Sequence, residues 1–443
     1  MRHNVVSTSR SLIAAAIALA AGLLITSCSS TTSSVGSASP GRVVTSDAST
    51  TLLVWTDSTR EPGFQEFQQT HPDVKMKIET YDPTTLLTKL QLFNRTGAGW
   101  PDVVFVSNPD QIANLASTQL NFAQPLDTLI PAAVQQGFGA TDDSCKIDGK
   151  LYCLRNDIGQ TVLWYNKKLL TQFGYSVPTT WAQYEALGAE VAKQHPGYVV
   201  GDAGDQYSYY DYFAGSGCPV QDVTGPNTVH IDLTDATCTR VASMLDTMLA
   251  NGSVSKDSLF SPDLNKLGQA QKVLMLPGAS WFGDFLFKPA SSFNTPNGEI
   301  AAAAYPAWPG ETTDYSGGFG GGVYVVSQHS KNMKGAAEIV QWMGTDTAYQ
   351  KSAPTYPAYA PAAQAWSQRL STDPFYATDP FPVLQQQASK INPEQHPTSF
   401  DVQAAFTAVL TPAVQSGKNI TSVLPQLQSE LVNLAKAAGY VVK

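Results

Sequence analysis

The chain has 443 residues, of which 43% are apolar and 14% charged, and its formal net charge at pH 7 is −9. This is the composition of a globular protein that is too long for one ordinary core. No cluster of Lys or Arg offsets the acidic balance, which argues against binding to nucleic acid or to an anionic membrane surface, and weakly against a strongly anionic ligand.

The N-terminus has the layout of a secretory signal. Arg2 and Arg10 give a positive start, and residues 12–25 form an uncharged apolar run that is too short for a comfortable membrane span. The closing Ile25-Thr-Ser-Cys28 resembles a bacterial lipobox, which implies removal of residues 1–27 and a lipid on the Cys28 sulfur. The alternative is an ordinary signal peptide with an incidental cysteine. Removing the two arginines takes the net charge to −11.

A Ser/Thr-rich linker is predicted over residues 28–50. Of the 22 residues from Ser29 to Thr50, 12 are Ser or Thr and none is aromatic. Such a segment buries too little apolar surface to offset the entropy of ordering it. As a flexible coil it would span roughly 26 Å. We therefore expect a stalk that joins a lipid anchor to the folded body.

The next residues alternate between strand and helix periods. Residues 51–55 and 101–106 are apolar runs typical of strands buried on both faces, and Val74, Met76 and Ile78 alternate as in a third strand. Between and after these runs, apolar residues recur at helical spacing: Phe64 and Phe67, then Leu86, Leu90 and Phe93, then Ile112, Leu115 and Leu120. The order βαβαβα predicts parallel strands, with ligands beyond their carboxyl ends.

Similar strand and helix patterns recur later in the chain. We expect strands at 161–165, 301–305 and 323–326, and a helix at 181–193 after the Pro178 turn. Further helices are predicted over 331–343 and 420–437, and the chain is mainly helical from about Val383 onward.

Four cysteines remain after Cys28, and an even number in an exported protein indicates two disulfides. We expect the pairing of near neighbours, Cys145 with Cys153 and Cys218 with Cys238. Asp148-Gly149 between the first two is a hairpin turn signal that would bring their sulfurs together. A metal site is the alternative, but the sequence has no CxxC.

The order and spacing of several motifs resemble the family 1 extracellular solute-binding proteins, the sugar-type receptors of ABC importers. The most specific is Gly174-Tyr-Ser-Val-Pro-Thr-Thr-Trp181. The others are Trp55-Thr-Asp57, Gly99-Trp-Pro-Asp-Val-Val104, Leu120-Asn-Phe-Ala-Gln-Pro-Leu-Asp127, Asp157-Ile-Gly159, Leu163-Trp-Tyr-Asn-Lys167, Gly278-Ala-Ser-Trp281, Tyr305-Pro-Ala-Trp-Pro-Gly310 and Gly320-Gly-Gly-Val-Tyr-Val-Val-Ser327.

The resemblance implies a two-lobed α/β fold of the type II periplasmic-binding-protein kind, in which each lobe is a mixed, mainly parallel sheet flanked by helices. Three crossovers would join the lobes, and the ligand would lie in the cleft between them. By motif position, lobe 1 would comprise 51–154 plus 306–346, and lobe 2 would comprise 155–305 plus 347–443. Hinge closure around the ligand is the expected motion.

A neutral sugar needs aromatic faces for its apolar side and paired polar groups for its hydroxyls. The resemblance places a stacking aromatic at Trp281, which has small neighbours, and a carboxylate at Asp157. Arg155 points the same way along an extended chain and would donate to hydroxyls or fix Asp157. Structural roles, a core Trp and a hinge ion pair, are the alternatives.

Further candidates come from strand ends and crossovers. Asp57 and Asn108 each come just after a predicted strand, and Trp55, the last residue of the first of these strands, would help to line the cleft or lie in the core. Backbone amides of Gly321 and Gly322 would approach the ligand closely, although relatives often carry a Trp where Val323 stands. Two tyrosines complete the set: Tyr210, from a cluster that also includes Tyr207, Tyr209 and Tyr212, and Tyr356, where relatives often carry Arg.

Catalytic signatures are missing, so we predict a binding protein without cofactor or metal rather than an enzyme. Gly278 to Gly283 has one residue too many for a nucleophile elbow, and no HExxH or GxxxxGK[ST] motif occurs. Asp57 and Asp157 leave a glycosidase as one alternative. Others are a receptor for a glycerophosphodiester or a short peptide, and an adhesive lipoprotein. The expected partners are a carbohydrate and the transmembrane subunits of an ABC permease. The protein would be a monomer on the outer face of the cytoplasmic membrane.

Overall fold

The computed structural model describes residues 46–443 apart from 226, 309, 311–314 and 393–395. The predicted signal peptide, Cys28 and most of the predicted linker lie outside these residues. Within the part of the chain that is described, no helix is long and apolar enough to cross a membrane.

The first three strands form the parallel sheet that the sequence predicted. β1 (Leu52–Thr56) lies between β2 (Met76–Thr80) and β3 (Val103–Val106) and is parallel to both. β15 (Val323–Val326) and β6 (Leu154–Arg155) extend the sheet with antiparallel pairs, giving the order β2-β1-β3-β15-β6. β3 and β15 are buried throughout, as expected for strands with both faces covered.

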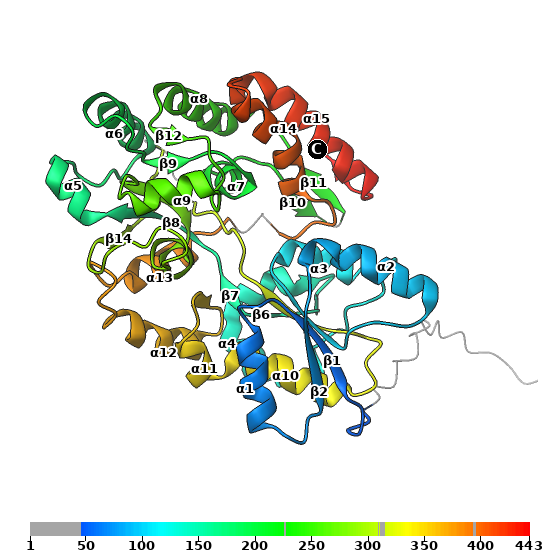
Figure 1. The fold of residues 1–443 in the computed structure, drawn as a ribbon. Coiled ribbons are helices and arrows are strands. Elements are labelled where there is room, and N and C mark those ends of the chain that lie inside the picture. The colour runs from blue at the N-terminus through cyan, green and yellow to red at the C-terminus, as the bar shows by residue number, and fades with distance from the viewer. Residues whose placement is uncertain (1–45, 226, 309, 311–314, 393–395) are drawn as a thin grey trace, which may run out of the picture. The chain divides into compact units, whose positions relative to one another are not determined.

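Helices flank this first sheet (Figure 1). α1 (Glu61–Thr70) packs against α10 (Met333–Thr345), and α2 (Leu86–Thr96) follows β2. The helix expected to reach Leu120 is shorter, because α3 (Ile112–Leu115) ends before a turn in which Asn121 has a φ of 48°.

The second sheet differs from the mainly parallel arrangement that was expected. β8 (Thr161–Asn166) is central, and both β13 (Met275–Ala279) and β14 (Ile300–Ala303) run antiparallel to it. Among the described strands of this part of the chain, two short pairs are parallel: β9 (Gly201–Asp202) with β12 (Val254–Ser255), and β11 (Thr228–His230) with β17 (Val441–Val442). A buried apolar run marks a strand without fixing its direction, which accounts for the difference.

The helix after β8 begins and ends where local chemistry dictates. The Asn166 side chain accepts a hydrogen bond from the Leu169 amide at 2.9 Å, and Gly174 ends α5 (Lys167–Phe173) with a φ of 74°. Thr180 then caps α6 (Trp181–Gln194), which matches the predicted helix. The other helices of this region are α7 (Gln206–Gly215), α8 (Ala236–Asn251), α9 (Pro262–Gln269), α14 (Val402–Gln415) and α15 (Leu424–Ala437).

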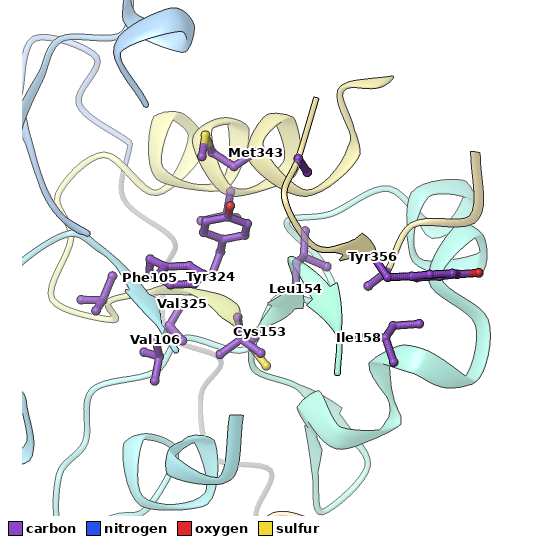
Figure 2. Close-up of a cluster of buried hydrophobic side chains, with 14 of the residues drawn as sticks. Phe105, Val106, Cys153, Leu154, Ile158, Tyr324, Val325, Met343 and Tyr356 are labelled. Carbon is purple, nitrogen blue, oxygen red and sulfur yellow. The ribbon is translucent and has the colours of Figure 1, made fainter. Parts of the chain in front are cut away.

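Three chain segments lie side by side between the two sheets. β15 pairs with β6, Gly318 bridges Gln160, and β16 (Tyr356–Pro357) pairs with β7 (Asp157–Ile158). Figure 2 shows side chains from all three segments in one apolar cluster: Leu154 and Ile158, Tyr324, and Tyr356. These contacts join chain positions 158 to 200 residues apart and fix the backbone around Asp157 and Gly321.

The buried apolar side chains form two clusters that meet at β8. Val162 and Trp164 belong to the cluster that contains the first sheet, whereas Leu163 belongs to the cluster around α6, α7 and α8. This alternation is the period of two expected of a strand. The first cluster also takes in residues of α12 (Ala360–Leu370) and α13 (Phe381–Ala388). The predicted lobe boundaries therefore stay a prediction.

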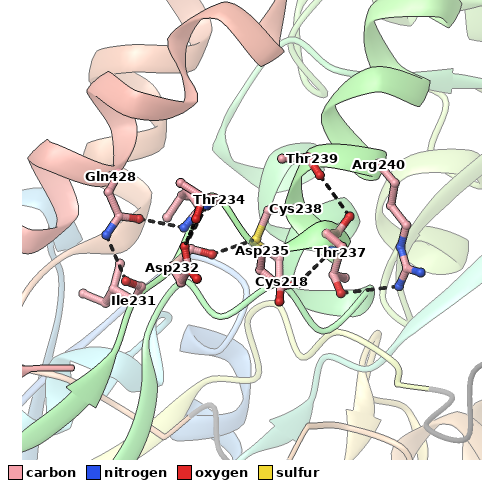
Figure 3. Close-up of a disulfide and its surroundings, with 12 residues drawn as sticks. Cys218, Ile231, Asp232, Thr234, Asp235, Thr237, Cys238, Thr239, Arg240 and Gln428 are labelled. Carbon is pink, nitrogen blue, oxygen red and sulfur yellow. Dashed lines mark hydrogen bonds between the residues drawn. A yellow bond between two sulfur atoms is a disulfide. The ribbon is translucent and has the colours of Figure 1, made fainter.

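Both predicted disulfides are confirmed. Cys145–Cys153 closes a hairpin of β4 (Lys146–Ile147) and β5 (Lys150–Leu151), in which Asp148 and Gly149 have φ values of 50° and 74°. Cys218–Cys238 joins the chain after α7 to the first turn of α8 (Figure 3). Gln428 of α15 braces the same region by accepting from the Leu233 amide and donating to the Ile231 carbonyl.

The remaining elements are short or peripheral. They are α4 (Ala132–Phe138), α11 (Thr347–Lys351), β10 (Asp222–Gly225), β11 (Thr228–His230) and β17 (Val441–Val442).

Candidate ligand-binding site

A cavity of about 250 Å³ lies where the loop after β3 and the start of α1 face α7, α9 and the end of β13. Five of the residues singled out from the sequence line it: Asn108, Asp157, Trp281, Gly321 and Gly322. These residues are up to 214 positions apart in the chain, and the crossing segments described above bring them together.

One side of the cavity is polar and centres on Arg60. Its guanidinium lies 3.2 Å from an Asp57 carboxylate oxygen and 3.7 Å from one of Asp157, and it sits 4.5 Å above the Phe105 ring. Burial lowers the pKa of Arg60, but the two carboxylates outweigh burial and the net shift is upward. The positive charge of Arg60 is therefore permanent and is balanced within the protein.

Asp157 is the most connected acceptor on this polar side. Its side chain is 2% exposed, and Oδ1 accepts hydrogen bonds from the Gly322 amide and from the Asn156 side chain, both at 2.7 Å. Oδ2 faces Arg60. A buried carboxylate is tolerated only when it is paired in this way.

The glycine segment before β15 permits a close backbone approach. Gly321 has a φ of 84°, and a Cβ there would meet the Arg155 side chain and the Asp157 carbonyl oxygen. The Gly322 amide is already bonded to Asp157, so it supports the cavity rather than offering a free donor. This differs from the role that the sequence suggested for that amide.

The opposite side of the cavity is aromatic. Trp281 lines it together with Tyr207, Phe260, Phe285 and Phe319. The Trp281 ring is only partly buried, and its indole N–H donates to the Phe319 carbonyl at 3.3 Å. Tyr207 meets Phe319 edge-on, with ring centroids 4.8 Å apart. These contacts hold the indole in place while leaving part of it open to the cavity.

The other five residues predicted for the site do not line this cavity. Asp57 lies beside the cavity and forms an ion pair with Arg60. Trp55 is 6% exposed, bonds Glu79 and stacks on Tyr81, so it is a core residue. Tyr356 stacks on Phe381.

Arg155 and Tyr210 instead line a neighbouring cavity of about 380 Å³, which shares Gly320 with the first. Arg155 donates to the Asp157 carbonyl at 3.1 Å and to the Ser144 hydroxyl at 2.6 Å. Its guanidinium therefore braces the crossing segments.

Several lining residues were not singled out from the sequence. Arg60 has a faint signal, because it follows Asp57 by three positions at the start of a helix. Phe260, Thr355 and Gln403 carry none, since each reaches the cavity from a chain-distant element. The Thr355 hydroxyl has no hydrogen-bond partner among the described residues.

This geometry suits a neutral molecule that has both hydroxyl groups and apolar faces. The polar side offers one guanidinium and two carboxylates as donors and acceptors, with no surplus positive charge, and the other side offers ring faces. The two sides come from different sheets joined by paired crossing segments, which is the construction of a two-lobed binding protein.

Comparison with known proteins identifies the class. The family model described as bacterial extracellular solute-binding protein matches residues 54–350. The chain belongs to this family. It is a family of solute-binding proteins rather than of enzymes, as the sequence predicted.

Individual relatives are distant. An arabinooligosaccharide-binding protein of Bacillus subtilis (strain 168) is 24% identical over 308 residues, 66% of this chain and 68% of the relative. The galacto-N-biose-/lacto-N-biose I-binding protein of an ABC transporter of Bifidobacterium longum superposes with a TM-score of 0.75 at 18% identity, covering 89% of this chain and 99% of that one. A receptor of Streptomyces glaucescens GLA.O, solved unliganded and with acarbose, gives 0.69 at 18% identity, covering 88% and 99%. The two solved structures establish the type II two-lobed fold.

Proposed function

We propose that this protein is the substrate-binding component of an ABC importer, that it captures a carbohydrate in the cavity at Trp281 and Asp157, and that it delivers the carbohydrate to the permease. The observation that carries the proposal is the pairing, in one cavity, of an aromatic wall with a polar side of hydrogen-bond donors and acceptors. Its similarity to an arabinooligosaccharide-binding protein and to a galacto-N-biose-/lacto-N-biose I-binding protein supports it.

The roles of the two sides follow from sugar chemistry. The apolar face of a sugar ring stacks on Trp281, and its hydroxyls donate to Asp157 and accept from Arg60. Because Arg60 is already paired with two carboxylates, those of Asp57 and Asp157, the polar side has no surplus positive charge to recruit an anionic ligand.

Transport couples to closure of the lobes. A ligand that contacts Asp157 and Trp281 together stabilises the state in which both sides reach it, and it shifts the lobes only by its differential affinity for that state. The three crossing segments are the hinge, because they are the short paired connections between the sheets.

A thermal-shift screen of the full-length protein in detergent tests the proposal. The panel contains arabinose, galactose and glucose with their di- and trisaccharides, a glycerophosphodiester and a tripeptide. Binding to the native state at 100 times Kd stabilises it by about 2.7 kcal/mol. A shift with a sugar that is lost in Trp281→Ala, but kept in Trp342→Ala outside the cavity, supports the proposal. A shift with only the phosphodiester or the peptide refutes the carbohydrate assignment.

The lipid anchor at Cys28 has its own test. Cys28→Ser removes the sulfur that would carry the lipid, so the protein should move from the membrane fraction to the medium or periplasm and lose labelling by radioactive palmitate. Membrane retention of the variant would refute the anchor. A monomer at micromolar concentration is expected in both cases.

A further inference from the structure

Two residues of the aromatic side, Trp281 and Phe285, belong to one short turn of unusual geometry. β13 ends at Ala279, and one turn of π-helix then spans Gly283–Phe287. The Phe285 amide donates to the Trp281 carbonyl at 3.0 Å, so both side chains enter the cavity from a single backbone unit. A π-helical turn is rare because its geometry is less favourable than that of an α-helix. Contacts from elsewhere in the fold are therefore needed to hold this one.

Such a contact comes from Arg369 of α12. The Asp284 side chain, which belongs to the π-helical turn, is 9% exposed, and its Oδ2 lies 2.7 Å from Nη2 of Arg369. Arg369 is 85 positions further along the chain and does not line the cavity itself. Because Asp284 is nearly buried, removing its partner would leave a carboxylate without compensation.

The same guanidinium reaches the crossing segment that ends in β16. Nη2 of Arg369 also donates to the Ala353 carbonyl at 3.2 Å. This nitrogen carries two N–H groups, one for each acceptor. Ala353 lies two residues before Thr355, which lines the cavity, and β16 then pairs with β7 at Asp157. One side chain therefore joins the turn on the aromatic side to the crossing segment on the polar side.

Two further charges close the network around Arg369. Asp373 is 10% exposed, and its Oδ2 lies 3.4 Å from Nη1 of Arg369 and 2.7 Å from Nζ of Lys288. Lys288, the first residue after the π-helical turn, lies 3.6 Å from Asp284. Cations and carboxylates thus alternate, and the turn is held by charges at both of its ends. A network of this kind fixes geometry better than an isolated surface pair does.

Resting on the proposed function, we infer that Arg369 is a positioning residue of the binding site. Its bonds to Asp284 and Ala353 set the distance between the aromatic and polar sides, and it contacts no ligand atom itself. A sugar that stacks on one side and forms hydrogen bonds with the other needs the two sides in place to within roughly 0.5 Å. This role is separate from the ligand contacts of Trp281 and Asp157.

Fluorine NMR of the full-length protein labelled with 5-fluorotryptophan tests the inference without a ligand. The chain has eight tryptophans, and Trp281→Phe identifies the Trp281 resonance. Arg369→Met should shift or broaden that resonance, whereas the Trp342 resonance should stay in place. Arg369→Lys should have the same effect, because an ammonium keeps the charge but lacks the planar fork that spans the two acceptors. The Lys variant carries the test if the Met variant does not fold.

Arg240→Met is the matched control. Arg240 lies 4.4 Å above the Trp308 ring, much as Arg369 lies 5.5 Å above that of Trp366. However, α8, which carries Arg240, contributes no residue to the cavity. Arg240→Met should therefore leave the Trp281 resonance where it is in wild type.

Isothermal titration then measures the consequence for binding. The probes are arabinose, galactose and glucose with their di- and trisaccharides. For the probe that wild type binds most tightly, Arg369→Met should raise Kd about tenfold, and the same change made in Trp281→Ala should raise it by less than about twofold. The second effect is smaller because a side without its indole has no stacking face left to position. Arg240→Met should bind as wild type does.

The outcomes separate the two proposals. A Trp281 resonance that is unchanged in both Arg369 variants overturns the inference and keeps the carbohydrate assignment. So does a Kd that Arg369→Met leaves unchanged, or raises equally with and without the Trp281 indole, because Arg369 would then support only the fold. Wild type that binds no sugar of the panel refutes the proposed function, and the positioning role falls with it.

Discussion

The polar and aromatic sides of the cavity are held in opposite ways. On the polar side, Arg60 and Asp157 are almost enclosed and form an ion pair. Arg60 also donates to Asp57, and Asp157 accepts from the Gly322 amide. On the aromatic side, Trp281 is partly buried and Phe260 is half exposed, and ring contacts position them. The polar side is thus held by buried ion pairs and hydrogen bonds of the fold itself, whereas the aromatic side consists of partly exposed rings that contact one another.

Because of this difference, we expect substitutions on the two sides to affect the stability of the protein and its sugar affinity to different degrees. Changes on the polar side leave buried charges or backbone amides without partners, which destabilises the native state as well as the site. Changes on the aromatic side remove surface that is already partly in water, so they should weaken binding with little effect on folding.

Replacing Asp157 should have the largest effect. Asp157→Ala leaves the Gly322 amide without its acceptor and Arg60 with only Asp57, so we expect about 3 kcal/mol less stability in urea unfolding and at least a 100-fold loss of sugar affinity. Asp157→Asn is the matched control, because its oxygen still accepts from Gly322, and its loss of stability should be smaller. If the unfolding free energy of Asp157→Ala were within 1 kcal/mol of wild type, the buried contacts of Asp157 would not be needed for stability, which would contradict this prediction.

A substitution at Gly321 tests whether the backbone on the polar side can accommodate a Cβ. Gly321→Ala introduces a Cβ at a φ of 84°, where it would also meet Arg155 and the Asp157 carbonyl. We expect a loss of about 2–3 kcal/mol, of which the positive φ accounts for about 1–2. Gly417→Ala is the control, since its φ of 73° is similar and no atom lies within 4 Å. If both variants lost the same unfolding free energy, the crossing segments would have moved to make room for the new Cβ at Gly321.

Trp281 tests the aromatic side. Trp281→Ala should weaken sugar binding by about 2 kcal/mol, roughly 30-fold, because the ring loses its stacking partner. The urea midpoint should fall less than that of Asp157→Ala. A variant that is as destabilised as Asp157→Ala would place Trp281 in the core and break the distinction between the two sides.

Asp142, behind the polar side, should have the smallest effect on sugar affinity, and it makes the stability depend on pH. Burial raises its pKa to about 7, against the opposing hydrogen bond from the Arg155 amide. The folded protein then keeps a proton that the unfolded chain releases above about pH 4. The stability contributed by the neutral carboxyl is therefore present at low pH and is lost as the pH rises from about 4 to 7, by at most about 1.4 kcal/mol per pH unit.

Asp142→Asn should remove this dependence, because the amide keeps an acceptor oxygen and does not ionise. The measurement is the urea unfolding free energy of both proteins at pH 5, 6, 7 and 8. Wild type should lose stability relative to the variant between pH 5 and 7, while sugar affinity stays equal in the two. A constant difference across the series would show that Asp142 is already ionised at pH 5.

Much of the fold was predictable because it is local. Apolar runs at 51–55 and 101–106 and the alternation at 74–78 predicted β1, β3 and β2, and their order predicted the parallel pairing. The Asp148-Gly149 turn predicted one disulfide. The antiparallel neighbours of β8 were not predictable in this way, because a strand's periodicity is the same in either direction.

The sequence by itself determined the strands of the first sheet, most of the helices, the cysteine pairs and the motifs that carry Trp281 and Asp157, since these depend on residues at most about 20 positions apart in the chain. Only the tertiary structure decided which side chains share the cavity. In the structure, Trp55 and Tyr356 lie in the core. Arg60 lies between Asp57 and Asp157, and Phe260 lies beside Trp281. Those contacts join residues far apart in the chain, and their distances follow from how the elements pack rather than from any local pattern.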